Sequence, residues 1–101
     1  MNTRKTTALF KAIKKDDLAA VKKLVAAGID INVKNKDGKT ALMCAAEHSK
    51  DPKIVKTLIT AGAGVNDNNK YAHTALMYAA MHNNNHMVIK TLLTAGAKAE
   101  K

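Results

Sequence analysis

The sequence predicts an all-α solenoid of three stacked helix-turn-helix units joined by hairpin-like loops. The first observation is a Thr-Ala-Leu motif that occurs at Thr7, Thr40 and Thr74, in steps of 33 and 34 residues. The second is a glycine that follows each motif at nearly the same interval, at Gly28, Gly62 and Gly96. Self-similarity at this period is typical of stacked repeat arrays. We therefore divide the chain into units at residues 2–34, 35–68 and 69–101, which together form one domain.

Composition limits the kind of protein this can be. Aromatic residues make up 3% of the 101 residues and tryptophan is absent, so the core must be aliphatic. Cys44 is the only cysteine and cannot form an internal disulfide, which fits a reducing compartment. The sequence lacks an apolar run long enough to span a membrane and the pattern of a secretory signal. We expect a cytoplasmic protein that does not bind membranes.

The first helix of each unit follows its Thr-Ala-Leu motif. In the second unit Asp37, Gly38 and Lys39 form a turn, and the hydroxyl of Thr40 can cap the helix that follows. That helix is expected over residues 41–46, where small alanines allow close packing against a neighbour. The equivalent segments of the other units begin at Thr7 and Thr74.

The second helix of each unit is longer and ends at the glycine. Pro52 fits the opening turn, where its missing N–H is not needed. Apolar residues then recur with helical spacing until Gly62, which can adopt the left-handed conformation at a helix end. Asp16, Asp17 and Asp51 stand where second helices begin, so we interpret them as capping residues.

These segments resemble the ankyrin repeat. The resemblance rests on residues 37–46 and 54–63, on their counterparts 74–80 and 88–97, and on Ile31-Asn32 and Val65-Asn66 after the glycines. The Thr-Pro-Leu-His of that family is replaced here by Thr-Ala-Leu followed by Phe10, Met43 or Met77, so a sulfur or aromatic contact should replace a histidine hydrogen bond. The second and third units also have one additional residue between their helices, which should loosen that turn.

The resemblance implies binding of another protein through a concave face of hairpin tips and first helices, without catalysis or cofactor. Transferred position by position, this face comprises sixteen residues: Arg4, Thr6, Lys14, Lys15, Lys34, Lys36, Asp37, Lys39, Glu47, His48, Asn68, Lys70, Tyr71, His73, Met81 and His82.

Charge suggests what the partner is like. The formal net charge is +9, and +6 of it lies in residues 1–36. Seven of the sixteen residues are Lys or Arg, which predicts a basic groove and an acidic partner. The excess charge could instead only solubilise an end repeat.

Residues that could perform chemistry have simpler interpretations. Cys44 is expected to be a buried thiol. His48 and His82 occupy equivalent positions, but stacked helices roughly 8–10 Å apart keep two imidazoles from sharing a metal. We therefore predict neither an enzyme nor a metal site.

Two other functions stay open. One is non-specific nucleic-acid binding by the basic groove, which charge alone supports. The other is an assembly role, through self-association or further repeats, because the third unit has no obvious polar outer face. Met77 and Tyr78 are the residues we expect to be exposed at that end.

Overall fold

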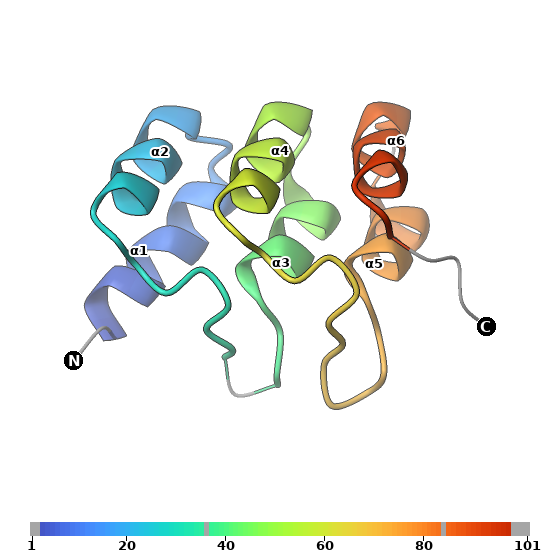
Figure 1. Cartoon of the computed structure of the whole chain (residues 1–101), viewed down its shortest axis with the longest axis horizontal. Helices are drawn as coiled ribbons and strands as arrows, with labels where there is room; N and C mark the ends of the chain where they lie inside the picture. The colour runs from blue at the N-terminus through green and yellow to red at the C-terminus, as the bar shows by residue number, and fades with distance from the viewer. Residues whose placement is uncertain (1–2, 36, 84, 98–101) are drawn as a thin grey trace.

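The computed structural model describes residues 3–35, 37–83 and 85–97, and these form six α-helices. The helices follow one another in pairs along the chain, as Figure 1 shows: α1 (Thr3–Lys14), α2 (Leu18–Ala26), α3 (Ala41–His48), α4 (Pro52–Thr60), α5 (Ala75–His82) and α6 (His86–Thr94). The all-α repeat architecture is confirmed.

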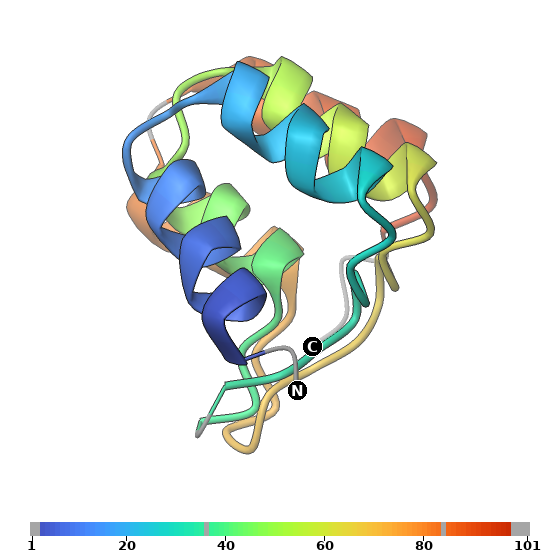
Figure 2. The same ribbon diagram turned by 90° about the vertical axis from the view of Figure 1, so that its left-hand side faces the viewer.

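The pairs stack into two layers. The first helices α1, α3 and α5 form one layer, and the second helices α2, α4 and α6 form the other (Figures 1 and 2). Two hairpin loops leave the stack beside the first helices, each closed by an antiparallel bridge, Lys34 with Thr40 and Asn68 with Thr74. The body measures 36 × 26 × 20 Å.

The middle of the core is α3. Six consecutive residues, 41–46, are buried, because α3 lies between α1 and α5 and beneath α4. Leu42, Leu58 and Leu92 are almost fully enclosed, and Leu76 is buried as well. The apolar stripes predicted from the sequence therefore meet in one aliphatic interior.

The predicted caps are present. The Thr40 hydroxyl accepts a hydrogen bond from the Met43 N–H at 3.3 Å, and the Met43 sulfur accepts one from the Thr40 N–H at 3.5 Å. A methionine thus closes a capping box in which Glu or Gln is usual. Gly28, Gly62 and Gly96 follow the second helices with φ of 83°, 105° and 101°, as predicted for left-handed helix ends.

The first unit begins differently from our expectation. Helix α1 starts at Thr3, so Thr7 lies within it and does not cap it. In the other units a hairpin ends immediately before the threonine, whereas the residues before Thr7 contain neither Gly nor Pro. Nothing in this segment stops the helix from extending toward the N-terminus.

The turns between paired helices are held together, contrary to the loosening that we predicted. The Asp16 carboxylate accepts hydrogen bonds from the Ser49 hydroxyl and the Lys50 N–H, which links the first unit to the second. The buried Asn83 amide donates to Ala46 O at 2.9 Å and to Ser49 O at 2.6 Å, which links the third unit to the second. The additional residue is absorbed by these contacts.

This arrangement also corrects one capping assignment. Asp17 caps α2 through the Ala20 N–H, and Asp51 caps α4 through the Lys53 N–H. Asp16 has φ of 58° and its carboxylate points to the neighbouring unit.

The exposed apolar residues are not the ones that we expected. Met77 and Tyr78 are half-buried in the third unit, because Tyr78 packs against the core. Met87 and Leu93 of α6 are instead about half exposed. None of the helices within the described residues has the length and hydropathy that a membrane crossing requires.

We expect Asn83→Ala to destabilise the protein by about 1–3 kcal/mol, because two carbonyls at the buried end of α3 lose their donor. Urea unfolding should show this. Asn68→Ala is the matched control, since its side chain is exposed, and should change stability by less than about 0.5 kcal/mol. Equal losses in the two variants would mean that the Asn83 contacts do not join the units.

Candidate functional site

The hairpins that support the candidate concave face are fixed by side-chain hydrogen bonds. The side-chain carbonyl oxygen of Asn35 accepts hydrogen bonds from the backbone N–H groups of Asp37 and Lys39. In the second hairpin the side-chain carbonyl oxygen of Asn69 accepts from the backbone N–H groups of Tyr71 and His73. The two hairpins also touch, because the Lys70 N–H donates to Asp37 O at 3.2 Å.

Gly38 permits this contact. It has φ of 78°, and a Cβ at this position would lie only 3.1 Å from the Lys70 nitrogen. Gly38 therefore allows the described parts of the two hairpins to lie in contact.

The first helices place equivalent residues of successive units in rows. One row consists of the equivalent residues Lys14, Glu47 and Met81, at or near the ends of α1, α3 and α5, and the next consists of Lys15, His48 and His82. The structure brings the Glu47 carboxylate oxygens to 3.3 Å from Nε2 of His48 and 3.9 Å from Nε2 of His82. Lys36 and the side chain of Arg4 lie outside the described residues.

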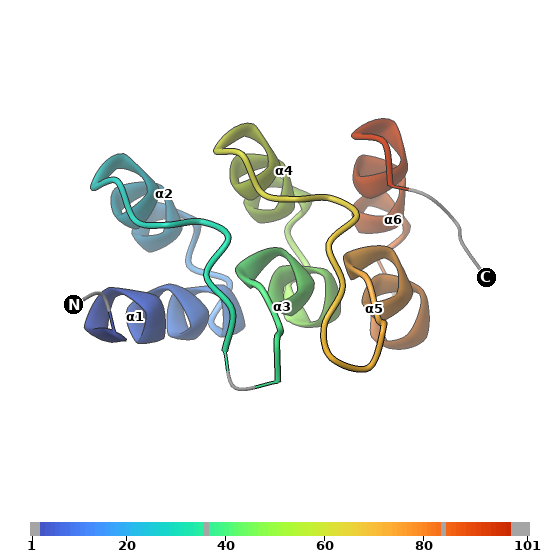
Figure 3. The same ribbon diagram turned by 60° about the horizontal axis from the view of Figure 1, so that its bottom comes forward.

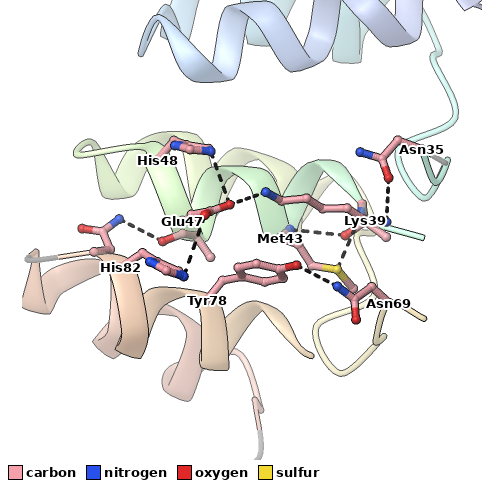
Figure 4. A network of polar contacts seen from close by, with 11 residues as sticks. Asn35, Lys39, Met43, Glu47, His48, Asn69, Tyr78 and His82 are labelled. Carbon is pink, nitrogen blue, oxygen red and sulfur yellow. Dashed lines mark hydrogen bonds and ion pairs between the residues drawn. The ribbon is translucent and has the colours of Figure 1, made fainter. Parts of the chain in front are cut away.

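Lys39 and Glu47 form the centre of the face (Figure 4). The Lys39 side chain runs along α3 and forms an ion pair with Glu47, and both side chains are less than one-fifth exposed. The Lys39 ammonium also lies 4.8 Å from the centre of the Tyr78 ring. A residue that we predicted as a free binding cation is thus paired with an acid and covered by a ring.

The carboxylate of Glu47 stays charged. Burial raises its pKa, but the hydrogen bond from Lys39 and the charges of Lys39, His48 and His82 together outweigh burial, so the pKa lies below 4.5. Burial also lowers the pKa of His48 below 6.5, and the nearby Lys39 and Lys14 add to this against the effect of Glu47. At neutral pH His48 is therefore mostly neutral.

Aromatic and imidazole rings line the third unit. Tyr71, His73, Tyr78 and His82 follow one another with ring-centre distances of 6.2, 5.7 and 6.3 Å. Tyr71 is 60% exposed at the hairpin tip, and the Lys70 ammonium lies 5.5 Å from its ring centre. Met81 is 54% exposed and extends the apolar surface.

The face is therefore less basic than we predicted from the sequence. Lys39 is neutralised by Glu47, and the Lys70 ammonium lies 3.7 Å from a carboxylate oxygen of Asp37. Lys14, Lys15 and Lys34 remain as exposed cations that form no ion pair within the described residues. Sequence reasoning missed the Lys39–Glu47 pair, although their opposite charges on either side of the same predicted helix could have suggested it.

The arrangement suits binding more than chemistry. Cys44 is enclosed in α3, and burial raises the pKa of its thiol more than Lys39 and Lys14 lower it. Within the described part of the chain, no group of three or more His, Cys, Asp or Glu side chains is placed to hold a metal.

Comparison with known proteins gives a consistent result. A family model described as ankyrin repeats, in three copies, matches residues 9–101. The chain is also similar to the crystal structure of the human ASB11 ankyrin repeat domain, with a TM-score of 0.85 and 28% sequence identity. The match covers 92% of this chain and 41% of the other, so this chain spans well under half of that domain. No curated protein sequence matches the chain.

We expect Glu47→Gln to lower the free energy of unfolding at neutral pH and to have a smaller effect in acid. A carboxylate with a lowered pKa stabilises the fold above its unfolded pKa, and that contribution is lost as pH falls below 4.5 through the folded value. Denaturant titrations of wild type and Glu47→Gln at several pH values will measure the difference in their free energies of unfolding. Asp37→Asn removes an exposed carboxylate and is the matched control. A gap between wild type and Glu47→Gln that does not narrow in acid would contradict the ionic role of Glu47.

Proposed function

Because the chain belongs to the ankyrin repeat family, we propose that it is a non-catalytic module that binds another protein through its concave face. Ankyrin repeats are generally protein–protein interaction modules. The proposed binding face comprises the hairpin tips and the exposed sides of α1, α3 and α5, which Figure 3 shows together.

The observation that supports this face most is the exposed apolar surface of the third unit. Tyr71 and Met81 are large side chains that stay exposed on a fixed backbone, while the rings between them hold a defined arrangement. Aromatic and methionine side chains are frequent anchors in interfaces. A surface that is ordered before binding loses little conformational entropy when a partner docks.

We propose an acidic partner surface opposite the N-terminal half of this face. Lys14 ends α1 and Lys15 follows it, both as exposed cations, and their charges would steer an acidic surface toward the site. Lys39 is a poor residue for testing this, because Lys39→Glu would place two carboxylates together and disturb the fold.

The test begins with affinity capture from the native host, identification of the captured protein and its purification. We expect the double variant Tyr71→Ala, Met81→Ala to bind this protein at least about tenfold more weakly, since interface anchors are worth about 2 kcal/mol or more. Isothermal titration calorimetry will measure the two dissociation constants.

The matched control is Met87→Ala with Leu93→Ala, which removes exposed apolar side chains from α6. Its affinity should stay within about twofold of wild type. If the control loses affinity and the concave-face variant does not, the concave face is the wrong surface.

An assembly role is a second candidate, supported by the exposure of Leu93 on α6. If it holds, light scattering will show concentration-dependent self-association that Leu93→Lys abolishes. A monomer at every concentration would argue against it. Nucleic-acid binding by the concave face has less support, because Lys39 is neutralised and Tyr71 is the only exposed tyrosine there.

A further inference from the structure

Uncompensated positive charge also lies on the other side of the molecule. The three second helices α2, α4 and α6 contain five lysines and no acidic residue: Lys22, Lys23, Lys53, Lys56 and Lys90. All four ion pairs between described residues involve the hairpins and first helices. Asp17 and Asp51, which precede α2 and α4, are occupied in capping.

Three of these lysines occupy the same position in successive repeats. Lys22, Lys56 and Lys90 are separated by 34 residues each, so the stacking of the repeats aligns them across α2, α4 and α6. Figures 1 and 2 show these helices side by side as one outer layer. Stacked helices lie roughly 8–10 Å apart, which sets the spacing of the row.

Two grooves separate the three helices, and the lysine row crosses both. The groove between α2 and α4 holds about 540 Å³ and is lined by Lys22, Lys53 and Lys56, with Val25 and Ala61 among its apolar residues. The groove between α4 and α6 holds about 320 Å³ and is lined by Lys56 and Lys90, with Ile59 and Met87 between them. Lys56 and Thr60 of α4 belong to the lining of both, so the two grooves lie on either side of α4 and share these residues.

The lining favours a protein ligand over a nucleic acid. No aromatic side chain lines either groove, so there is no platform on which bases could stack. The apolar side chains between the lysines of the grooves would instead contact apolar side chains of a protein ligand in which such residues alternate with carboxylates.

The spacing selects an extended acidic segment. A polyproline II helix repeats every three residues and rises about 3.1 Å per residue, so every third side chain recurs on one side after about 9.3 Å. This matches the separation of the stacked helices. We propose that the outer face is a second interaction surface, which binds an extended acidic segment of a partner protein with a carboxylate at every third residue.

In this arrangement Lys22, Lys56 and Lys90 each pair with one carboxylate. The intervening residues of the segment rest on Val25, Ile59 and Met87. This surface is independent of the concave face, and either can exist without the other.

The probe is a fluorescein-labelled peptide of four Glu-Pro-Pro repeats with blocked ends, measured against the full chain by fluorescence anisotropy at about 20 mM salt, where charges are weakly screened. A peptide of the same composition with its four glutamates in one block tests the spacing. A single-stranded DNA of similar charge tests for a general polyanion site. The Glu-Pro-Pro peptide should bind at least fivefold more tightly than either.

The site is located by two triple variants that remove the same charge. Lys22→Gln, Lys56→Gln, Lys90→Gln should weaken peptide binding by about tenfold or more, whereas Lys5→Gln, Lys11→Gln, Lys50→Gln, at exposed positions elsewhere, should weaken it less than about threefold. Amide chemical shifts of the wild-type protein should change on α2, α4 and α6. If the triple variant does not fold, the single variant Lys56→Gln replaces it. Its circular dichroism spectrum should match that of wild type, and its peptide binding should be weaker.

Every other result overturns the proposal. Absence of binding, equal binding of the block peptide or DNA, or equal losses in the two triple variants would each show that the outer lysines only solubilise the fold. Chemical shift changes confined to the hairpins and first helices would place the peptide on the concave face, which would leave the proposed function standing and this inference rejected.

Discussion

The close stacking of alanine-rich first helices is the constraint on which this structure depends. Helix α3 is buried along residues 41–46 because its neighbours α1 and α5 approach from both sides. Two helices with one apolar stripe each cannot enclose a core, so each unit needs the next one. The stack also fixes the step between units, and every row of equivalent surface residues inherits that step.

Side chains that bond to the backbone of the neighbouring unit make this stack rigid. Asp16 holds the turn around Ser49, and Asn83 holds the end of α3. Asn32 also links the first unit to the second, because its side-chain amide donates to Gly62 O and its side-chain carbonyl accepts from the Gly64 N–H. The Asn83 contacts satisfy buried carbonyl groups across the joint, so sliding one unit past another would leave these carbonyls unpaired. The surface rows therefore keep their register.

Features that depend on nearby residues could be predicted from the sequence. Thr40 caps α3 and glycines end the second helices because these preferences are local to a few residues. The contacts of Asp16 and Asn83 could not be predicted, since their partners lie 33 to 37 residues away and depend on how the units stack. The positive charge of the concave face was overestimated because a count of charged residues ignores ion pairing. In the structure Lys39 is neutralised by Glu47.

The two faces differ in how their charge is organised, and this difference separates two modes of recognition. On the concave face Lys39, Glu47 and Tyr78 satisfy one another, so exposed rings and Met81 dominate what a partner meets. Apolar contacts of this kind depend little on salt. On the outer face the lysines belong to helices that contain no acidic residue, so these lysines repel one another, and counterions or an anionic ligand relieve this repulsion. Since screening acts on exposed charges, rising ionic strength should weaken the proposed binding to the outer face more than the apolar contacts proposed for Tyr71 and Met81. If both proposed surfaces bind, this short repeat array would hold two partners that respond differently to ionic strength, because the stacking that aligns the second helices also aligns their lysines.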